Sequence, residues 1–289
     1  MVILASKPGQ LGNMLMLFSN LIARSIESGF TVANPAFNDY AEYFAATRQD
    51  VFCRYPPQIS IVRPLRILRG LLYHLSNLIV RVLGHVPWKF SRCRDLTLRD
   101  WTTQYDLGKP EFLSIIRSKQ LLFLRGWLFR DSESMKRHAD KIREFFRPVE
   151  THARRAEDLI RQAHADADIL IGVHIRHGYL YFAKHRQYFY ATVRYAAMMD
   201  KLCRLFTGTR VAFLVCSDWA QDPDIFRRFN VTWGTNHLIE DMYAFAGCDY
   251  LVGPPSTFTI WASFYGNVPL NLILHPDQNL SLADFTIYA

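Results

Sequence analysis

Residues 169–176 read Ile-Leu-Ile-Gly-Val-His-Ile-Arg, an apolar run that ends at a cation. A continuous apolar run of this length predicts a strand that is buried on both faces, as in a parallel sheet. Further apolar runs follow, separated by segments with helical patterns: runs at 211–216, 250–252 and 270–274, helices at 188–206, 236–247 and 256–265. This alternation predicts an α/β fold whose C-terminal part, 166–289, is a doubly wound parallel sheet.

The first 35 residues predict a β-α-β unit. A short apolar run at 2–5 is followed by a turn at 7–13, and apolar residues then recur at helical spacing until Gly29. Glycine commonly ends a helix, because its backbone adopts the left-handed conformation without strain. The pattern of 36–165 is mostly helical, and we place the boundary between the N-terminal and C-terminal parts at 165/166.

The net charge of +8 is concentrated in one segment of the chain. No acidic residue occurs between Asp50 and Asp95, and the rest of the chain carries 26 basic and 26 acidic residues. The segment holds eight cations: Arg54, Arg63, Arg66, Arg69, Arg81, Lys89, Arg92 and Arg94.

A basic amphipathic helix is expected within an insertion at about 59–94. Apolar residues recur every three or four positions from Val62 to Val82, and a second stripe at the same spacing carries Arg63, Arg66 and Arg81. Three interpretations stay open. The helix packs on the domain with solvated arginines, it docks on an anionic membrane surface, or it binds nucleic acid. The third is disfavoured, because no nucleic-acid-binding module is present.

Composition excludes several classes of protein. Half of the residues are hydrophobic and 21% are charged, which is not the composition of a disordered or collagen-like chain. The five cysteines are odd in number and form no Cys-x-x-Cys pair, so a reducing compartment is expected. No apolar stretch is long enough to span a bilayer, and the N-terminus does not read as a signal peptide. We therefore expect a cytoplasmic protein.

Arg176 is the residue whose position most strongly indicates a ligand. Ligands of doubly wound sheets bind outside the carboxyl ends of the strands, and Arg176 directly follows a buried strand. An unpaired buried guanidinium is very costly, so this side chain must meet an anion. Phosphate fits its planar fork, although a structural carboxylate is the alternative. His174 is expected to point the same way, because side chains alternate along a strand.

Three other strand ends and one helix start also carry candidate residues. Glycines at 9 and 12 precede Asn13 between a strand and a helix, where backbone can approach a ligand or simply turn. Asp218 follows a second buried strand, and Glu240 and Asp241 lie in the first turns of a helix. Each carboxylate either caps local backbone or binds a ligand. Ser256 is a good N-cap, and the amides of Thr257 and Phe258 would offer an anion site.

A phosphate-seeking arginine, a helix N-terminus and carboxylates together fit a nucleoside-diphosphate ligand. The chain lacks the lysine of a P-loop, which disfavours ATP hydrolysis. Two Asp-x-Asp sequences, a pattern that can bind a metal, stand at 166–168 and 222–224. Both are interpreted as solvated or capping carboxylates, so no metal is expected.

These loops, in this order, resemble the motifs of the fucosyltransferase superfamily, which includes α-1,2-, α-1,6- and protein O-fucosyltransferases. Residues 9–14 are similar to its G-R-L-G-N-Q sequence, and 174–178 to its H-x-R-R-G-D, the most specific motif. Residues 213–218 resemble a strand that ends in F-S-D. Residues 241–252 and 256–261 resemble the final block of the family, whereas 36–165 match nothing in it.

The resemblance implies a GT-B fold, with two Rossmann-like domains and a cleft between them, and GDP-fucose as the donor. The C-terminal domain would bind the donor, and the N-terminal domain would face the acceptor. Transfer would invert the anomeric centre without a metal. By position, Arg176 would stabilise the leaving diphosphate, and the donor would be held by His174, Asp218, Asp241, Ser256, Thr257, Phe258, Gly12 and Asn13.

Two departures from the family motif stand at 177 and 179. His177 replaces the second arginine of H-x-R-R-G-D, and Tyr179 replaces its aspartate. No general base is identifiable, and His177, His185 and Glu240 are candidates for the base or for acceptor contacts. We expect an inverting fucosyltransferase that acts on a glycan hydroxyl, and docking of the basic helix would place it at the inner face of the membrane. The alternatives are a GT-B enzyme with another nucleotide sugar and an inactive carbohydrate- or membrane-binding homologue.

Overall fold

The structure is a computed structural model that describes residues 1–83, 93–100, 102–118 and 121–288. The chain divides into two compact units, Met1–Val149 and Glu150–Ala289. The sequence led us to expect the division at 165/166, and helix α7 (Glu150–His164) lies between the two positions. This helix packs on helix α10 (Leu238–Phe245) and on strand β9 (Val211–Ser217), so its contacts assign it to the second unit.

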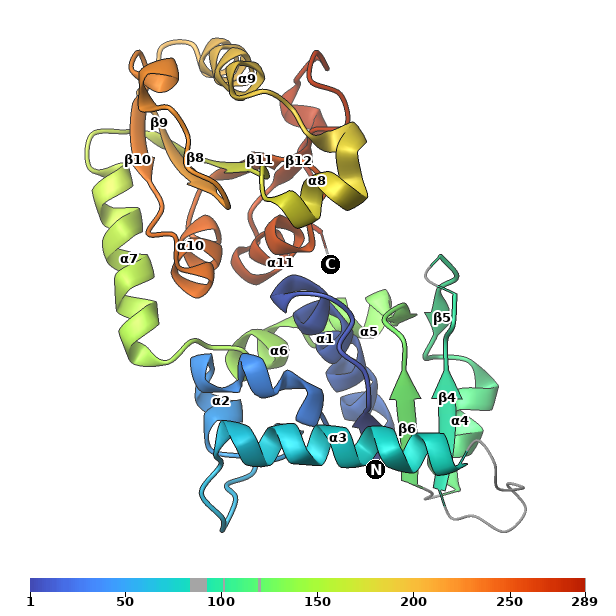
Figure 1. Ribbon diagram of the computed structural model, residues 1–289. Helices are drawn as coiled ribbons and strands as arrows, with labels where there is room; N and C mark the ends of the chain where they lie inside the picture. Colours follow the sequence, from blue (N-terminus) through green and yellow to red (C-terminus); the bar gives the residue numbers. More distant parts are fainter. Residues whose placement is uncertain (84–92, 101, 119–120, 289) are drawn as a thin grey trace. The chain divides into compact units, whose positions relative to one another are not determined.

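The second unit is built on a parallel sheet of five strands in the order β10-β9-β8-β11-β12 (Figure 1). The other four strands are β8 (Ile169–Ile175), β10 (Asn230–Trp233), β11 (Tyr250–Gly253) and β12 (Leu270–Leu272). The predicted doubly wound sheet is therefore confirmed. Strand β10 was not predicted, because its four residues carry two polar side chains and no buried one.

Helices cover both faces of this sheet. Alternate residues of β8, among them Ile171 and Val173, share a core with α9 (Thr192–Leu205). On the other face His174 packs against rings of α10 and of α11 (Thr257–Gly266). Figure 1 shows α10 and α11 on one side of the strands and α9 on the other. The remaining elements are α8 (Tyr179–His185), η4 (Arg186–Tyr188), η5 (Pro223–Phe226) and η6 (Leu282–Asp284).

The strand order fixes where a ligand is expected. From β8 the chain adds β9 and then β10 on one side, and it crosses back to add β11 and β12 on the other. Strands β8 and β11 are therefore the pair at which the direction of winding reverses. In doubly wound sheets a crevice opens at the carboxyl ends of such a pair, because the following loops turn away from each other.

The first unit contains a mixed sheet in the order β3-β2-β1-β6-β4. Its strands are β1 (Val2–Leu4), β2 (Val32–Ala33), β3 (Arg54–Tyr55), β4 (Cys93–Thr97) and β6 (Leu121–Arg125). The predicted β-α-β unit is confirmed as β1, α1 (Leu11–Ser28) and β2. Gly29 ends α1 in the left-handed conformation, with φ of 66°, and its amide donates to the carbonyl of Ser25.

The mostly helical pattern expected for 36–165 is wrong at β4 and β6. Strand β6 pairs with β1, and β4 pairs with β6 at the edge of the sheet. A cation in each strand, Arg94 in β4 and Arg125 in β6, limits the apolar run in the sequence. The other elements of this region are short: η1 (Pro35–Asp39), η2 (Ala41–Tyr43), α2 (Ala45–Arg48), β5 (Tyr105–Asp106), α4 (Pro110–Arg117), β7 (Phe129–Arg130), α5 (Ser132–Arg137) and α6 (Ala139–Phe145).

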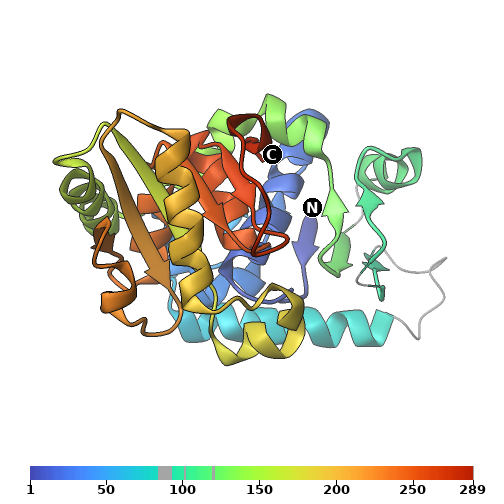
Figure 2. The same ribbon diagram turned by 90° about the horizontal axis from the view of Figure 1, so that it is seen from above.

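The predicted basic helix is present as α3 (Arg66–Leu83), the long cyan helix of Figure 2. It contacts η1 and β4. Its packing differs from a simple amphipathic helix, because Arg69 is fully buried whereas Ile67, Leu71 and Leu78 are more than half exposed. Lys89 and Arg92, two of the eight cations of the segment, lie outside the described residues.

Arg69 is what attaches α3 to the unit. It forms an ion pair with Glu42 and donates to the backbone carbonyls of Thr47, Arg48 and Asp50. A cation therefore faces inward and satisfies carbonyls at the end of α2, while apolar side chains of α3 face outward. In the part of the chain that the structure describes, no helix is both long and apolar enough to cross a lipid bilayer.

Candidate functional site

Arg176 lies directly after β8, at the switch point of the second sheet, and three elements hold its side chain. Nε donates to Oδ2 of Asp218 at the end of β9, over 3.1 Å. Nη1 donates to Oγ of Ser256 before α11, over 2.9 Å. The guanidinium carbon lies 4.5 Å from the ring centre of Tyr181 in α8, an attractive cation–π distance. These contacts fix both the direction and the plane of the guanidinium.

Asp218 shapes the loop that carries Arg176. Its Oδ1 accepts from the backbone amides of His177, over 2.6 Å, and Gly178, over 2.8 Å. A Cβ atom at position 178 would lie 2.7 Å from Oδ2 of Asp218, so only glycine lets the loop approach this closely. In this arrangement the carboxylate positions Arg176 and caps its loop, and its expected contact with the donor stays a prediction.

The ion pair with Asp218 leaves donors of Arg176 unused. A guanidinium has five N–H groups, and the bonds to Asp218 and Ser256 occupy two of them. Nη2 has no hydrogen-bond partner among the residues that the structure describes, and the side chain is 18% exposed. Pairing with a structural carboxylate and binding of a ligand are therefore compatible. Asp218 accepts from Nε of Arg176 and leaves Nη2 available to a ligand.

Ser256 is the N-cap of α11, as predicted. Its Oγ accepts from the backbone amide of Phe258, over 3.2 Å, as well as from Arg176. A serine hydroxyl has two acceptor sites and one proton, so with both acceptor sites in use the hydroxyl can only donate further. The amide of Phe258, which we expected to bind a ligand directly, is engaged by Ser256 instead. The hydroxyl and the unused N–H groups of Arg176 form a set of donors that suits an anion.

His174 is buried beside these groups, between the rings of Phe245 and Phe258 at 5.8 and 5.0 Å. Its Nδ1 has no hydrogen-bond partner among the described residues. Burial, followed by the nearby charge of Arg176, holds the pKa of His174 well below its usual value. The imidazole is therefore neutral at neutral pH. Gly253 gives it room, because a Cβ there would lie 2.8 Å from Cβ of His174.

Asp241 is engaged by the loop that precedes α10. Its Oδ1 accepts from the amide of Thr235 over 2.7 Å and from the hydroxyl of the same residue over 3.1 Å. Burial raises the pKa of Asp241, and the bonds from Thr235 and Asn236 oppose that rise. The carboxylate thus orders the loop in this structure, and its expected contact with guanosine stays a prediction.

Both ring nitrogens of His177 are engaged, which removes it as a ready proton acceptor. Nε2 lies 2.6 Å from the carbonyl of Tyr190 and therefore carries the proton, and Nδ1 faces the amide Nε2 of Gln221 at 3.1 Å. The ring also stacks on Phe189 at 4.6 Å. The residue that replaces the second arginine of the family motif therefore supports the loop between α8 and α9.

His185 and Glu240, the other two base candidates, differ in exposure. His185 is exposed on α8 beside the ring of Tyr181, and burial, Arg176 and Lys184 lower its pKa. Glu240 is 4% exposed and accepts hydrogen bonds at Oε1 from His152 and Arg155. Burial would raise the pKa of Glu240, but these bonds prevail and lower it. Of the three candidates, His185 is exposed, whereas His177 is half-buried and Glu240 is buried.

In the first unit, the glycines and Asn13 form a tight turn before α1. Gly9 has φ of 91°, a conformation that favours glycine, and a Cβ there would lie 2.7 Å from Nδ2 of Asn13. Gly12 is buried in the first turn of α1. The side-chain amide of Asn13 therefore packs against the backbone of Gly9, where any larger residue would clash with it. The expected contact of Gly12 and Asn13 with the donor stays a prediction.

One carboxylate of each Asp-x-Asp sequence is engaged in local structure, and the expectation that neither sequence binds a metal stays a prediction. Asp168 accepts from Nη2 of Arg210 at 2.8 Å, and Asp222 caps η5 by accepting from the amide of Asp224 at 3.0 Å.

Tyr181 is the site residue that the sequence analysis missed. It contacts Arg176 through its ring, and its hydroxyl donates to the carbonyl of Pro255, over 3.1 Å. The only indication of this role in the sequence was an aromatic residue in the helical turn that follows the motif at 174–178.

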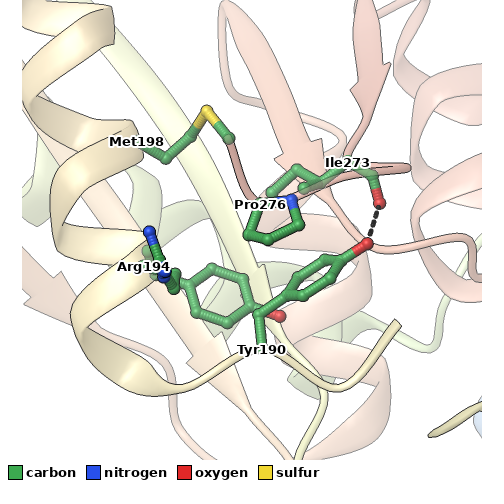
Figure 3. Close-up of a pocket in the computed structure, with 6 residues that line it drawn as sticks. Tyr190, Arg194, Met198, Ile273 and Pro276 are labelled. Atoms are coloured by element: carbon green, nitrogen blue, oxygen red, sulfur yellow. Dashed lines mark hydrogen bonds between the residues drawn. The ribbon is translucent and has the colours of Figure 1, made fainter. Parts of the chain in front are cut away.

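A separate pocket lies on the α9 face of the sheet, where the Tyr190 hydroxyl donates to the carbonyl of Ile273 (Figure 3). It is lined mainly by apolar groups and does not include Arg176.

No protein-family model matches the sequence, and no curated protein matches it significantly. Solved structures do match. Arabidopsis thaliana FUT1, solved as a mutant with GDP, aligns with a TM-score of 0.58 at 13% identity and covers 99% of this chain and 73% of its own. Fucosyltransferase NodZ from Bradyrhizobium aligns with a TM-score of 0.57 at 16% identity, over 96% of each chain.

A third match is POFUT1 in complex with GDP, with a TM-score of 0.54 at 10% identity over 92% of this chain and 94% of that one. NodZ has also been co-crystallised with GDP. At such low identities these matches show the fold. The chain has the GT-B fold of the fucosyltransferases, and the resemblance that the sequence motifs indicated is confirmed at that level.

Proposed function

We propose that the protein is an inverting glycosyltransferase that moves L-fucose from GDP-fucose to a glycan hydroxyl, without a metal, in the manner of α-1,2-fucosyltransferases. One observation carries the proposal. At the switch point of the second sheet, Arg176 and Ser256 are bonded to each other and retain N–H and O–H groups that can only donate. The structures with the same fold include three solved with GDP, which makes a nucleoside diphosphate the natural anion.

In the proposed reaction the acceptor oxygen forms a bond to C1 of fucose while the bond from C1 to the β-phosphate oxygen breaks. Both electrons of the broken bond leave with GDP, so negative charge grows on the diphosphate. Arg176 and the Ser256 hydroxyl stabilise this charge more in the transition state than in the ground state, which is what lowers the barrier. Removing one such donor typically costs about 10²–10³ in rate.

The acceptor hydroxyl must lose its proton in the same reaction. Among the three base candidates we assign His185, because its ring is exposed and its lowered pKa leaves it neutral at pH 7. The neutral imidazole of His174 and the carboxylate of Asp241 are assigned to the guanosine, and Thr257 to the phosphate at the start of α11. Each of these contacts requires only residues at the carboxyl edge of the sheet.

The test is release of GDP from GDP-fucose by the purified full chain, with and without a panel of oligosaccharide acceptors. We expect acceptor-dependent release that Arg176→Ala reduces at least about 100-fold while the melting temperature stays near that of the wild type. Faster turnover of another nucleotide sugar would establish the alternative of a different donor. Absence of binding to every nucleotide sugar would establish an inactive homologue, and normal turnover by Arg176→Ala would disprove the site.

We also propose that the protein works at an anionic membrane, on the cytoplasmic side, with α3 as the contact. The support is the outward apolar face of this helix, where Ile67 is 78% exposed and Leu71 61%, in a segment of eight cations without an acidic residue. Contiguous exposed apolar surface is unusual on monomers, and self-association of this face would bring like charges together. Anionic lipid satisfies both the apolar and the cationic groups.

Liposome flotation tests this contact. The chain should float with vesicles that contain phosphatidylserine and stay behind with neutral ones, and Leu71→Glu should abolish flotation. Leu282→Glu is the matched control, because Leu282 is 46% exposed and lies in the second unit. Equal binding of the wild type and Leu71→Glu, or no binding of either, would show that α3 packs on the domain and is not the membrane contact.

A further inference from the structure

Two histidines and a buried glutamate meet at the start of α10, in a cluster that the proposed transfer reaction does not use as a unit. His152 comes from the first turn of α7, His237 is the N-cap of α10, and Glu240 lies in the first turn of that helix. Their ligand atoms all lie within 4.8 Å of one another. The two imidazoles stack with 4.4 Å between ring centres and 17° between planes.

We propose that His152, His237 and Glu240 form a binding site for a divalent transition-metal cation, with zinc as the expected occupant. Two imidazoles and one carboxylate are a ligand set that zinc, cobalt and nickel accept, whereas magnesium and calcium prefer oxygen alone. The proposed cation is structural and takes no part in transfer of the sugar, so the proposal is independent of the function assigned to Arg176.

Two of the three ligand distances suit a single cation, and one imidazole must rotate out of the stack to bind it, because the nitrogens of rings only 17° from parallel do not point at a common atom. A tetrahedral ion with bonds of about 2.1 Å separates its ligand atoms by about 3.4 Å. Oε1 of Glu240 lies 2.9 Å from Nδ1 of His152 and 3.9 Å from Nδ1 of His237, which bracket that value. Nδ1 of His237 also accepts from the amide of Glu240, but at 3.5 Å this is a long hydrogen bond that a metal can replace.

Arg155 is the competitor for this position. Its Nη1 donates to the same Oε1 of Glu240, over 3.0 Å, from a side chain that is 66% exposed. A bound cation would displace the guanidinium into solvent, which costs little for an exposed side chain. Glu240 itself is only 4% exposed, so its carboxylate stays in place and needs a positive partner in either state.

The consequence is a link between two helices. Glu240 precedes Asp241, whose carboxylate orders the loop before α10. His152 belongs to α7, which is the first element of the second unit. A metal bound by all three residues would join α7 to that loop. Because a cation that binds only the folded chain stabilises it by mass action, zinc should raise the melting temperature.

The test uses the full chain with any affinity tag removed, titrated with ZnCl₂ by calorimetry and with CoCl₂ by visible absorption. One equivalent should bind, with a tetrahedral cobalt spectrum that shows no thiolate band. His152→Ala and His237→Ala should each weaken binding at least about 100-fold, because loss of a ligand exceeds the 10–100-fold cost of losing an outer partner. His164→Ala should bind as the wild type does, although His164 also lies on α7 and pairs with a carboxylate, Asp249.

Arg155→Ala separates a metal site from a purely structural cluster. Removing the competitor should tighten zinc binding several-fold, and transfer activity measured without added metal should be unchanged. The proposal is overturned if neither zinc nor cobalt binds the wild type. It is also overturned if binding survives in both His152→Ala and His237→Ala, or if the bound cobalt shows thiolate ligands.

Discussion

Nη1 of Arg176 and Oγ of Ser256 lie 2.9 Å apart and connect the end of β8 to the N-cap of α11. Strands β8 and β11 are neighbours at the switch point of the sheet, so this hydrogen bond spans the mouth of the expected crevice. Both partners are also held from behind, Arg176 by Asp218 and Ser256 by the amide of Phe258. Groups fixed in this way need no reorganisation when charge develops on a ligand.

Ser256→Ala should impair both stability and donor handling. Loss of the N-cap costs about 1 kcal/mol of unfolding free energy, and loss of the hydroxyl removes one donor to the diphosphate. We expect a lower midpoint in urea and a fall in kcat of about tenfold or more. Ser256→Thr is the control, because it retains a hydroxyl that can cap the helix. Equal activity of the alanine variant and the wild type would exclude a role in charge stabilisation.

Asp218→Ala should act through Arg176. It leaves the amides of His177 and Gly178 without their acceptor and releases Nε of Arg176. Because Asp218 is about one-third exposed, we expect a loss of unfolding free energy near the low end of about 1–3 kcal/mol. Donor KM should rise with the loss of orientation. Asp277→Ala, which breaks an exposed pair with Arg194, should change stability by less than about 0.5 kcal/mol.

Two glycines should respond to alanine in opposite ways. At Gly253 a Cβ would lie 2.8 Å from Cβ of His174, so the two strands must separate, and we expect destabilisation of about 1–3 kcal/mol. At Gly70, inside α3, the nearest atom to a Cβ lies at 3.7 Å. Alanine should stabilise there by about 0.5–1 kcal/mol, because it restricts the unfolded chain. Urea unfolding of both variants measures the difference, and destabilisation of similar size at both positions would contradict it.

The buried and exposed arginines of α3 should differ in their effect on stability. Arg69→Leu removes the hydrogen bonds to three backbone carbonyls and the ion pair with Glu42, and should cost about 3–5 kcal/mol. Arg66→Ala removes an ion pair with Asp39 whose arginine is 69% exposed, and should cost at most about 1 kcal/mol. Thermal unfolding distinguishes them. A similar loss for both would mean that Arg69 does not anchor the helix.

His174 should make the second unit less stable in mild acid. Its pKa in the folded chain lies well below the ordinary value of 6.5, first because of burial and then because of Arg176. As the pH falls below 6.5 the unfolded chain takes up a proton that the folded chain does not, so the unfolding free energy decreases. The stabilisation is therefore complete above pH 6.5 and is lost on acidification.

This pH dependence is measured by urea unfolding at pH 7.5, 6.5 and 5.5. His174→Phe should flatten the slope by up to about 1.4 kcal/mol per pH unit, whereas His74→Ala, at an exposed position of α3, should keep it. An unchanged slope in His174→Phe would show that the ring is not held neutral.

The sheet of the second unit was predictable because its central strands are continuous apolar runs, and Arg176 and Ser256 stand at the ends of two of them. Strand β10 was not, since its register is set by pairing with β9 and not by its own apolar side chains. The same holds for β4, which has no buried side chain and takes its place in the first sheet from its pairing with β6.

Partners of single side chains were harder to predict than elements. The sequence indicated that Arg176 needs an anion, but not that Asp218 would supply one while leaving Nη2 open. It indicated a basic amphipathic helix, but not that Arg69 would turn inward to backbone carbonyls. These outcomes depend on which loops the fold brings together, and residue spacing along one segment does not contain that information.

Calorimetric titration with GDP and GMP, of the wild type and of Arg176→Ala, tests the central claim most directly. The wild type should bind GDP at least about tenfold more tightly than GMP, because the β-phosphate provides the charge that Arg176 and Ser256 hold. Arg176→Ala should remove this preference while keeping a melting temperature near that of the wild type. Equal affinity of wild type and Arg176→Ala for GDP would contradict the account.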